Sequence, residues 1–540
     1  MPAAELEWKV YEVTEGVVGA RDAIAPAEAR VDVWIPDLSE YPEALDKAKI
    51  LLETAAEVEH ALLVQYLYAA FSLKGSAEGA DDSQKNSLKK WLRELRQIAQ
   101  QEMAHLMSVE NLLLAIGLPP NLEREDFPPR KDLYPFELHL EALTQKSLAK
   151  YVTAEAPQDA TGIDAIVEQA KDKEGAAINH VGTIYGLLGV LFSTEQQIET
   201  GGSGSESWDR LLRRVAKAAD QQNPDRSKWH LGESTIDPQT LTFQAASEVW
   251  HGATVHQIGN RDAARAAIRQ IGEQGEGPTS GGGLSHFERF LSMYRGGDGV
   301  LPFPSEGEWI PTRAVPRDQK TDAIAEPRTQ RWAQLADLRY TLLLGFIEHH
   351  LLTSDAGDRK HLADWAFDEM DALRELSGIL VALPLGNGCA ALSFTMPKLL
   401  HLPATEQERW QLQRDRTNAA ISHVQQMQAA DPADPNADFL GGLRGTDKDR
   451  LLLMHGEAPP QSTSFARDIL PLFRQKDIDH MNDQVGMDLT DFVTVRDSAV
   501  SISQRLKGVG GRRMPPPPDP PLPDDKIKLF DTWMAEGFPP

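Results

Sequence analysis

The chain has 540 residues, of which 41% are apolar and 25% charged, and its formal net charge is −26. This composition is typical of a globular protein of two or three domains, and the acidic balance argues against nucleic acid or an anionic membrane as a partner. The single cysteine, Cys389, excludes an internal disulfide, a thiolate zinc site and an iron–sulfur cluster. No run of about 18 apolar residues and no signal-peptide pattern occur, so we expect a cytoplasmic protein without a membrane span.

Apolar residues that recur at three- and four-residue spacing predict a mainly α-helical body. A strand is predicted first, at 30–36. Gly117, followed by Pro119 and Pro120, is expected to end the second helix. The sequence 404–439 is polar and rich in Pro and Asp, and we place a domain boundary shortly after it. The predicted helices span residues 42–74, 86–117, 140–157, 178–199, 262–277, 284–295, 331–352 and 361–383.

The stretch QEMAHL places Glu102 and His105 three residues apart on the second predicted helix, so both side chains lie on one helix face. If that face is buried, the two polar groups need partners, because burying them alone is costly. A metal ion is one candidate partner. A solvated pair and a hydrogen-bonded core network are the alternatives, and an isolated Glu-x-x-His also arises by chance.

A dinuclear iron or manganese site in a four-helix bundle needs a Glu from each of two helices and a Glu-x-x-His from each of the other two. Carboxylates bridge two divalent cations, one imidazole binds each, and open positions remain for O2 or peroxide. On the first helix we prefer Glu59 to Glu57, because Glu59 has more apolar neighbours in the sequence. The complete set of candidate metal ligands is Glu59, Glu102, His105, Glu155, Glu276 and His286.

Two simpler interpretations of these acids and histidines stay open. Glu57, Glu59 and His60 could form a polar helix face in water. The stretch FIEHHLL (346–352) is a second acidic–histidine cluster, but adjacent histidines point to different faces of a helix. At most one of them could therefore join a site.

Several motifs follow one another between residues 45 and 295: AAEVEHALLVQYLYAAFSL, IAQQEMAHLMSVENLLLAIGLPPNLEREDFP, SLAKYVTAEAP, VGTIYGLLGVL, IRQIGEQGEG and SHFERF. This region resembles the ferritin-like domain of the iminophenyl-pyruvate dimer synthase family, which acts in bisindole pathways such as those to violacein and rebeccamycin. The stretch FDEMDALRELSGILVALP resembles the region that follows in such proteins. The resemblance implies a ferritin-like four-helix bundle with a dinuclear metal centre, and it supports Glu59, Glu102 and His105 as ligands.

One departure concerns Glu276 and His286, which are separated by a segment containing PTSGGG and cannot share one helical turn. Either the fourth helix is broken and the two ligands converge from both sides of a loop, or the site is incomplete. A mononuclear site and a protein without metal therefore stay open. Tyr185 in GTIYGLL could face the site as a hydrogen-bond donor or radical partner, and a core tyrosine is the alternative.

The segment from FARDILPLF to FDTWMAEGFP resembles a small c-type cytochrome domain. In that family a Cys-x-x-Cys-His attaches the haem, and a Met followed by Pro-Pro supplies the second axial ligand. Here both cysteines are missing, so covalent attachment is excluded, while His480 and Met514 stand where the axial ligands would. We favour a haem-free domain used for packing or partner contact, with non-covalent haem held by His480 and Met514 as the alternative.

The expected organisation has four parts: an N-terminal extension (1–41), the ferritin-like bundle (42–300), additional helices packed on the bundle (301–445) and a cytochrome c-like domain (446–540). The leading hypothesis is a metal-dependent oxidase, oxygenase or oxidative coupling enzyme. It would act on a small amino-acid-derived substrate, with dinuclear iron and with O2 or peroxide.

Two other functions stay open. One is a non-catalytic metal-binding or structural scaffold whose C-terminal segment contacts a pathway protein. The other is a synthase that orients a reactive imine without metal redox chemistry. A homo-oligomer is also compatible with the sequence.

Overall fold

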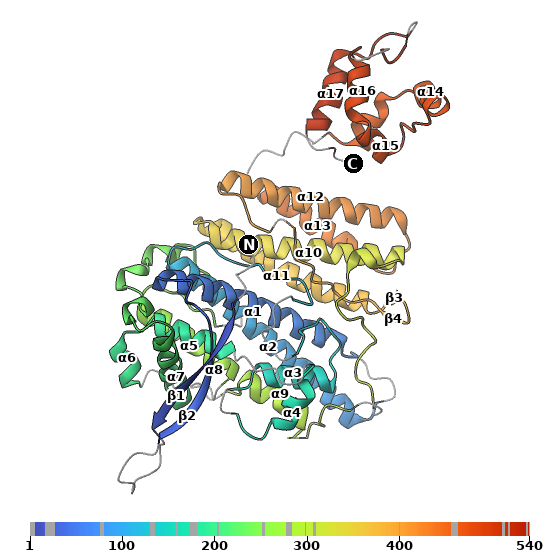
Figure 1. Ribbon diagram of the computed structural model, residues 1–540. Coiled ribbons are helices and arrows are strands. Elements are labelled where there is room, and N and C mark those ends of the chain that lie inside the picture. The colour runs from blue at the N-terminus through green and yellow to red at the C-terminus, as the bar shows by residue number, and fades with distance from the viewer. Residues whose placement is uncertain are drawn as a thin grey trace. The chain divides into compact units, whose positions relative to one another are not determined.

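In the computed structural model the chain divides into two compact units, residues 1–454 and 455–540 (Figure 1). The expected boundary after residue 445 falls within helix α13 (Ala437–Leu453), and the division comes just beyond the end of that helix. The structure describes all residues except 1–5, 17–27, 76–79, 130–135, 158–159, 173–180, 202–204, 251–253, 277–282, 298, 306–308, 399, 455–462, 510–512, 517–518, 536–537 and 539–540.

A two-stranded antiparallel sheet opens the first unit. Strands β1 (Trp8–Gly16) and β2 (Glu28–Pro36) pair so that Val13 lies opposite Val31. The predicted strand 30–36 is part of β2, whereas β1 was not predicted. Val33 is fully buried, because the ribbon packs against helix α7 (Glu206–Gln222).

Two long helices, α1 (Ala44–Ser72) and α2 (Asp82–Ala115), lie side by side and form half of a bundle (Figure 1). Helix α2 begins four residues before its predicted start, because Asp81 caps it. The Asp81 carboxylate accepts from the Gln84 backbone N–H at 2.8 Å, and the Gln84 side chain accepts from the Asp81 N–H at 2.9 Å. Gly117 follows the end of α2 with φ +79°, a conformation that favours glycine.

Four shorter helices complete the bundle: α3 (Gln145–Ala154), α5 (Val181–Leu191), α8 (Arg261–Glu276) and α9 (His286–Arg295). Helix α3 packs against α9, and α5 packs against α8 and α1. The bundle is therefore interrupted along two of its edges, and side chains at these helix ends can point inward. Most of the PTSGGG segment lies outside the described residues. The short helices α4 (Asp164–Ala170) and α6 (Glu195–Thr200) lie between these elements in the chain.

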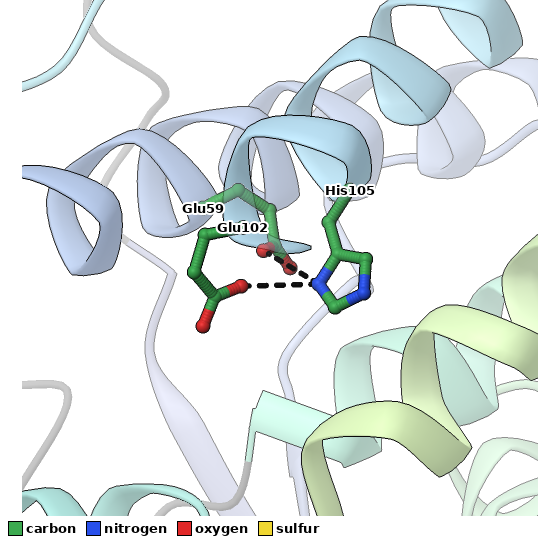
Figure 2. Close-up of side chains that lie close together, drawn as sticks. All are labelled: Glu59, Glu102 and His105. Atoms are coloured by element: carbon green, nitrogen blue, oxygen red, sulfur yellow. Dashed lines mark hydrogen bonds and ion pairs between the residues drawn. The ribbon is translucent and has the colours of Figure 1, made fainter. Parts of the chain in front are cut away.

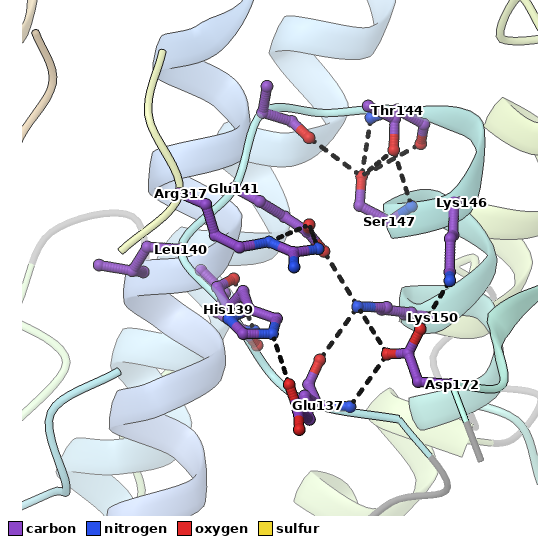
Figure 3. A network of polar contacts seen from close by, with 12 residues as sticks. Glu137, His139, Leu140, Glu141, Thr144, Lys146, Ser147, Lys150, Asp172 and Arg317 are labelled. Carbon is purple, nitrogen blue, oxygen red and sulfur yellow. Dashed lines mark hydrogen bonds and ion pairs between the residues drawn. The ribbon is translucent and has the colours of Figure 1, made fainter. Parts of the chain in front are cut away.

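A buried lysine on α3 anchors the chain that precedes this helix (Figure 3). Lys150, which is 2% exposed, donates to the Glu137 carbonyl at 3.0 Å and to the Glu141 carboxylate at 3.2 Å. Its Nζ also lies 3.4 Å from a carboxylate oxygen of Asp172. The paired cation therefore joins α3 to the chain that precedes it, and Glu155 follows at the end of the same helix.

A second layer of the first unit consists of α10 (Pro327–Leu352), α11 (Ala356–Leu380), α12 (Glu406–Ala430) and α13. The first two were predicted, but 404–439 was interpreted as a polar segment without a helix. Helix α12 buries Trp410, Thr417 and Val424 on one narrow face, while most of its other residues are polar. The few apolar residues are therefore hard to recognise as a helical pattern in the sequence. Short strands β3 (Pro384–Leu385) and β4 (Gly388–Cys389) form a tight hairpin.

The second unit contains α14 (Gln475–Val485), α15 (Phe492–Asp497), α16 (Ala499–Leu506) and α17 (Asp524–Ala535) around a separate core centred on Trp533. The protein is mainly α-helical, as predicted. The remaining short elements are 3-10 helices at Arg226–Trp229, Glu233–Thr235, Pro238–Thr242, Thr321–Ala323 and Leu470–Leu472, and a π-helical turn at Phe465–Ile469.

Candidate metal centre

Glu59 on α1 and the pair Glu102 and His105 on α2 point toward one another inside the bundle (Figure 2). The His105 Nδ1 atom lies 3.0 Å from Glu102 Oε2 and 3.4 Å from Glu59 Oε2. The three-residue spacing on α2 places the acid and the imidazole on one face, and that face is buried. The structure therefore brings together the three residues that the sequence singled out first.

Glu102 also faces a second group of ligand atoms. Its Oε1 lies 3.1 Å from His286 Nδ1, which is 3.8 Å from Glu155 Oε2. Glu155 caps the C-terminus of α3, and His286 is the first residue of α9. The interrupted helices thus place these two side chains inside the bundle. The candidate ligands thus form two triads, Glu59–Glu102–His105 and Glu102–Glu155–His286, which share Glu102. Within each triad the ligand atoms lie within 4.8 Å of one another.

The five side chains are almost completely removed from solvent. Their exposed fractions are 3% for Glu59, 2% for Glu102, 4% for His105, 6% for Glu155 and 1% for His286. Among the described residues, Glu59 Oε2, Glu102 Oε1 and His286 Nδ1 lack a hydrogen-bond partner of good geometry. Buried polar atoms of this kind are costly unless another group satisfies them. Hard carboxylate oxygens and imidazole nitrogens are suitable ligands for iron or manganese, so the donor set fits such a metal.

Burial and the close approach of acids and histidines shift the pKa values of the site residues. Burial, together with the nearby Glu102, raises the pKa of Glu59 to about 7. Although burial opposes it, Glu102 and Glu155 raise the pKa of His286 to about 9, and Glu102 and Glu59 raise the pKa of His105 well above its usual value. Carboxylates thus stabilise protonated imidazoles, and binding of a cation would displace those protons.

Space in the site is small. A cavity of about 20 Å³ is lined by the five candidate ligands together with Tyr185, Leu62 and residues of α8. About 10–15 Å³ is enough for one water molecule, whereas pockets for drug-sized molecules measure about 300–1,000 Å³. The cavity therefore suits ions and small molecules of the size of water or dioxygen.

Two tyrosines donate hydrogen bonds to carboxylates of the site. The Tyr185 hydroxyl donates to Glu59 Oε1, so this predicted residue does face the site. The Tyr66 hydroxyl donates to Glu155 Oε1 at 2.5 Å, and Tyr66 was not predicted. Its signal in the sequence was the seven-residue spacing from Glu59, which places both side chains on the same face of α1.

The other candidates add no ligand to the two triads that the described residues form. Glu276 ends α8, and its side chain lies outside the described residues. Glu57 lines a different pocket, beside Arg124. In the FIEHHLL cluster, His349 Nε2 contacts Glu406 at 2.8 Å and His350 donates to the Arg359 carbonyl at 2.8 Å. Neither histidine belongs to the two triads that the described residues form.

The second unit has its own cavity of about 550 Å³, and both His480 and Met514 line it. His480 lies on the exposed face of α14, and Met514 is half-buried. The lining is mostly apolar and includes Met481 and Leu506. The two residues that the cytochrome resemblance singled out therefore share one cavity.

Residues 52–295 match the ferritin-like protein family. These residues form a ferritin-like domain. Over 384 residues the chain is 24% identical to dichlorochromopyrrolate synthase from Lentzea aerocolonigenes, an alignment that covers 62% of this chain and 34% of that protein. The match thus spans about a third of the length of this curated relative. No solved structure gives a significant match. None of the described helices combines the length and apolar character that crossing a membrane would require.

Proposed function

We propose that the protein is a ferritin-like metal-dependent oxidase or oxidative coupling enzyme that acts on a small amino-acid-derived substrate. The observation that carries this proposal is the position of Glu102, whose Oε2 faces His105 and whose Oε1 faces His286. A carboxylate shared in this way would help to hold two cations. The likeness to dichlorochromopyrrolate synthase, whose name describes an enzyme that makes a small molecule, supports the same class of activity.

Five residues would hold the metal ions: Glu59, Glu102, Glu155, His105 and His286. When bound, dinuclear iron would supply oxidation chemistry with O2 or peroxide. The protein's part is to exclude water, because all five side chains are buried, and to orient the carboxylates. Tyr185 holds Glu59 by donating its hydroxyl hydrogen bond, and burial together with Glu59 raises the pKa of that hydroxyl well above its usual value, so it keeps its proton.

A non-catalytic metal-binding scaffold is the second candidate, and the small cavity favours it. A volume of about 20 Å³ leaves no room for an aromatic amino acid beside the candidate ligands. An enzyme of this kind would act on a substrate at the edge of the site or change shape when the substrate binds. Turnover separates the two candidates, because a scaffold binds metal without consuming O2 in a substrate-dependent way.

The deciding experiment is elemental analysis of the full chain purified without a metal-binding tag, followed by exposure of the ferrous protein to O2. We expect about two iron atoms per chain and an O2-dependent change in the absorption spectrum, as for other dinuclear carboxylate proteins. The variant E102Q should bind far less metal, since it weakens a ligand of both triads. Its far-ultraviolet circular dichroism should stay unchanged.

The matched control is E57Q. Like Glu102, Glu57 is a buried acid in a long bundle helix, at 7% exposed on α1, but it lies outside both triads. We expect its iron content to equal that of the wild type. Full iron content in E102Q, or equal losses in E102Q and E57Q, would contradict the proposed centre.

For the second unit we propose a module for partner contact that carries no covalent haem. The chain's single cysteine, Cys389, precedes this unit, so thioether attachment has no sulfur available. The cavity beside His480 and Met514 could accept non-covalent haem, which would give the purified protein a Soret absorption band. Such a band, lost in a His480→Ala variant, would overturn the haem-free proposal.

A further inference from the structure

Each histidine of the candidate metal centre has a glutamine on the side that faces away from the carboxylates. His105 Nε2 lies 2.8 Å from Oε1 of Gln274 on α8. His286 Nε2 lies 3.2 Å from Oε1 of Gln101 on α2. In both imidazoles Nδ1 faces Glu102, so the two rings share one arrangement although they come from different helices.

This arrangement determines which nitrogen carries the proton. An amide oxygen accepts hydrogen bonds and cannot donate them, so the Nε2 atom that faces it must carry hydrogen. A neutral imidazole protonated at Nε2 has its free electron pair on Nδ1. In both histidines this is the atom that faces the carboxylates. The outer partner of a metal-bound histidine commonly fixes the tautomer and the orientation of the ring in this way.

The chemical nature of the partner also matters. A carboxylate at the same place would increase the negative charge around a site that already holds three buried acids, and burying such charge is costly. Glutamine orients the ring without adding charge. Both glutamines are half-buried.

We propose that Gln274 and Gln101 are positioning residues of the metal centre, each of which holds its histidine in the Nε2-protonated form so that Nδ1 is free to bind a cation. This inference rests on the metal centre of the proposed function. It goes further in naming two residues that contact no metal ion and yet determine metal affinity.

The test uses the full chain and ferrous iron, with dissociation constants measured anaerobically by competition with a chelator. The variants Q274L and Q101L keep a side chain of similar size but lose the acceptor, and we expect each to bind iron about 10–100-fold more weakly. The variants Q274E and Q101E keep an acceptor at the same position, and we expect them to retain most of the affinity.

Matched controls are Q270L, one turn before Gln274 on α8, and Q100L, the exposed neighbour of Gln101 on α2. Both should bind iron as the wild type does. Wild-type affinity in Q274L and Q101L would overturn the inference. Equal losses in the Leu and Glu variants would also overturn it, because packing rather than hydrogen bonding would then be responsible.

A second measurement remains available if the Leu variants do not fold. An anionic acceptor should stabilise the higher oxidation state, so Q274E and Q101E should lower the reduction potential of the bound iron, and an unchanged potential would overturn the inference. A wild-type protein that binds no iron would refute the proposed function as well. A wild-type protein that binds iron, with insensitive Leu variants, would refute this inference alone.

Discussion

The position of the Glu155 side chain depends on a glycine, Gly275, at the facing position of α8. A Cβ atom added to Gly275 would lie 3.2 Å from Glu155 Oε2, closer than ordinary van der Waals contact. Tyr66 holds the other oxygen of the same carboxylate, and the cavity around it is small, so Glu155 has little room to move. Gly275 is the second-last residue of α8, and its missing side chain leaves this space to Glu155.

We therefore expect G275A to reduce iron affinity by about 10-fold or more while leaving the melting temperature unchanged or higher. Chelator competition and thermal unfolding check the two parts separately. The control is G378A on α11, where an added Cβ meets nothing within 4 Å. That variant should gain stability without any change in affinity. Unchanged affinity in G275A would show that Glu155 adapts freely.

The site residues differ in how well the sequence predicted their positions. Glu102 and His105 could be paired because one helical turn joins them, whereas Glu155 and His286 lie at helix ends, where periodicity gives no signal. Glu57 and Glu59 were hard to separate by pattern, since both are buried on α1. Metal binding itself stays a prediction.

Glu110 on α2 is a fully buried acid outside the candidate centre, and burial raises its pKa to about 8. In the unfolded chain the pKa is about 4.3, so between these values the folded protein binds more protons. The contribution of this group to stability is therefore lost as the pH rises, by at most about 1.4 kcal/mol per pH unit.

The variant E110Q removes this titration and keeps an oxygen for the Asn121 N–H, which now donates to Glu110 Oε2 at 2.7 Å. We expect E110Q to gain stability relative to the wild type as the pH rises from 5 to 8. Urea unfolding at both pH values measures the difference. If the stability difference between E110Q and the wild type were the same at pH 5 and pH 8, Glu110 could not be protonated in the folded protein.

At the scale of elements, long amphipathic helices could be predicted and the interruptions between them could not. Periodicity located α1, α2, α10 and α11, because one face of each helix is buried along its length. It missed α7 and α13, and also α12, whose surface is mostly polar. It joined α5 and α6, which a cap at Thr194 separates. Local hydrogen bonds of capping residues decide such boundaries.

A buried ion network joins three helices of the second layer. Arg339 on α10 donates to Asp447 on α13 at 2.8 Å and contacts Glu369 on α11 at 3.3 Å, and Arg450 pairs with Glu369. All four side chains are at most 3% exposed. Removing one partner leaves an uncompensated charge in the interior, which costs far more than the intact network contributes.

We expect R339M to lower the free energy of unfolding of the first unit by about 3–5 kcal/mol. The control is R374M on α11, which breaks an exposed pair with Asp371 and should cost at most about 1 kcal/mol. Denaturant unfolding compares the two variants. Similar losses of unfolding free energy in R339M and R374M would show that the buried network contributes no more to stability than an exposed ion pair.

For the whole molecule, two separate hydrophobic cores predict two unfolding events. One core extends over residues 13–454, and the other gathers Phe465, Val495, Phe530 and Trp533 in the second unit. The second unit is small, and small domains bury less of their surface and are only marginally stable.

Calorimetry of the full chain should therefore show two transitions, with the smaller one due to the second unit. Trp533 is 0% exposed, so W533A should cost about 3–5 kcal/mol and shift only the smaller transition. The matched variant W332A, which truncates a tryptophan that is 1% exposed on α10, should shift only the larger one. A single transition that moves with both variants would mean that the units unfold together. In that case the second unit would depend on the ferritin-like domain for its stability, and its role as a separate module would have to be abandoned.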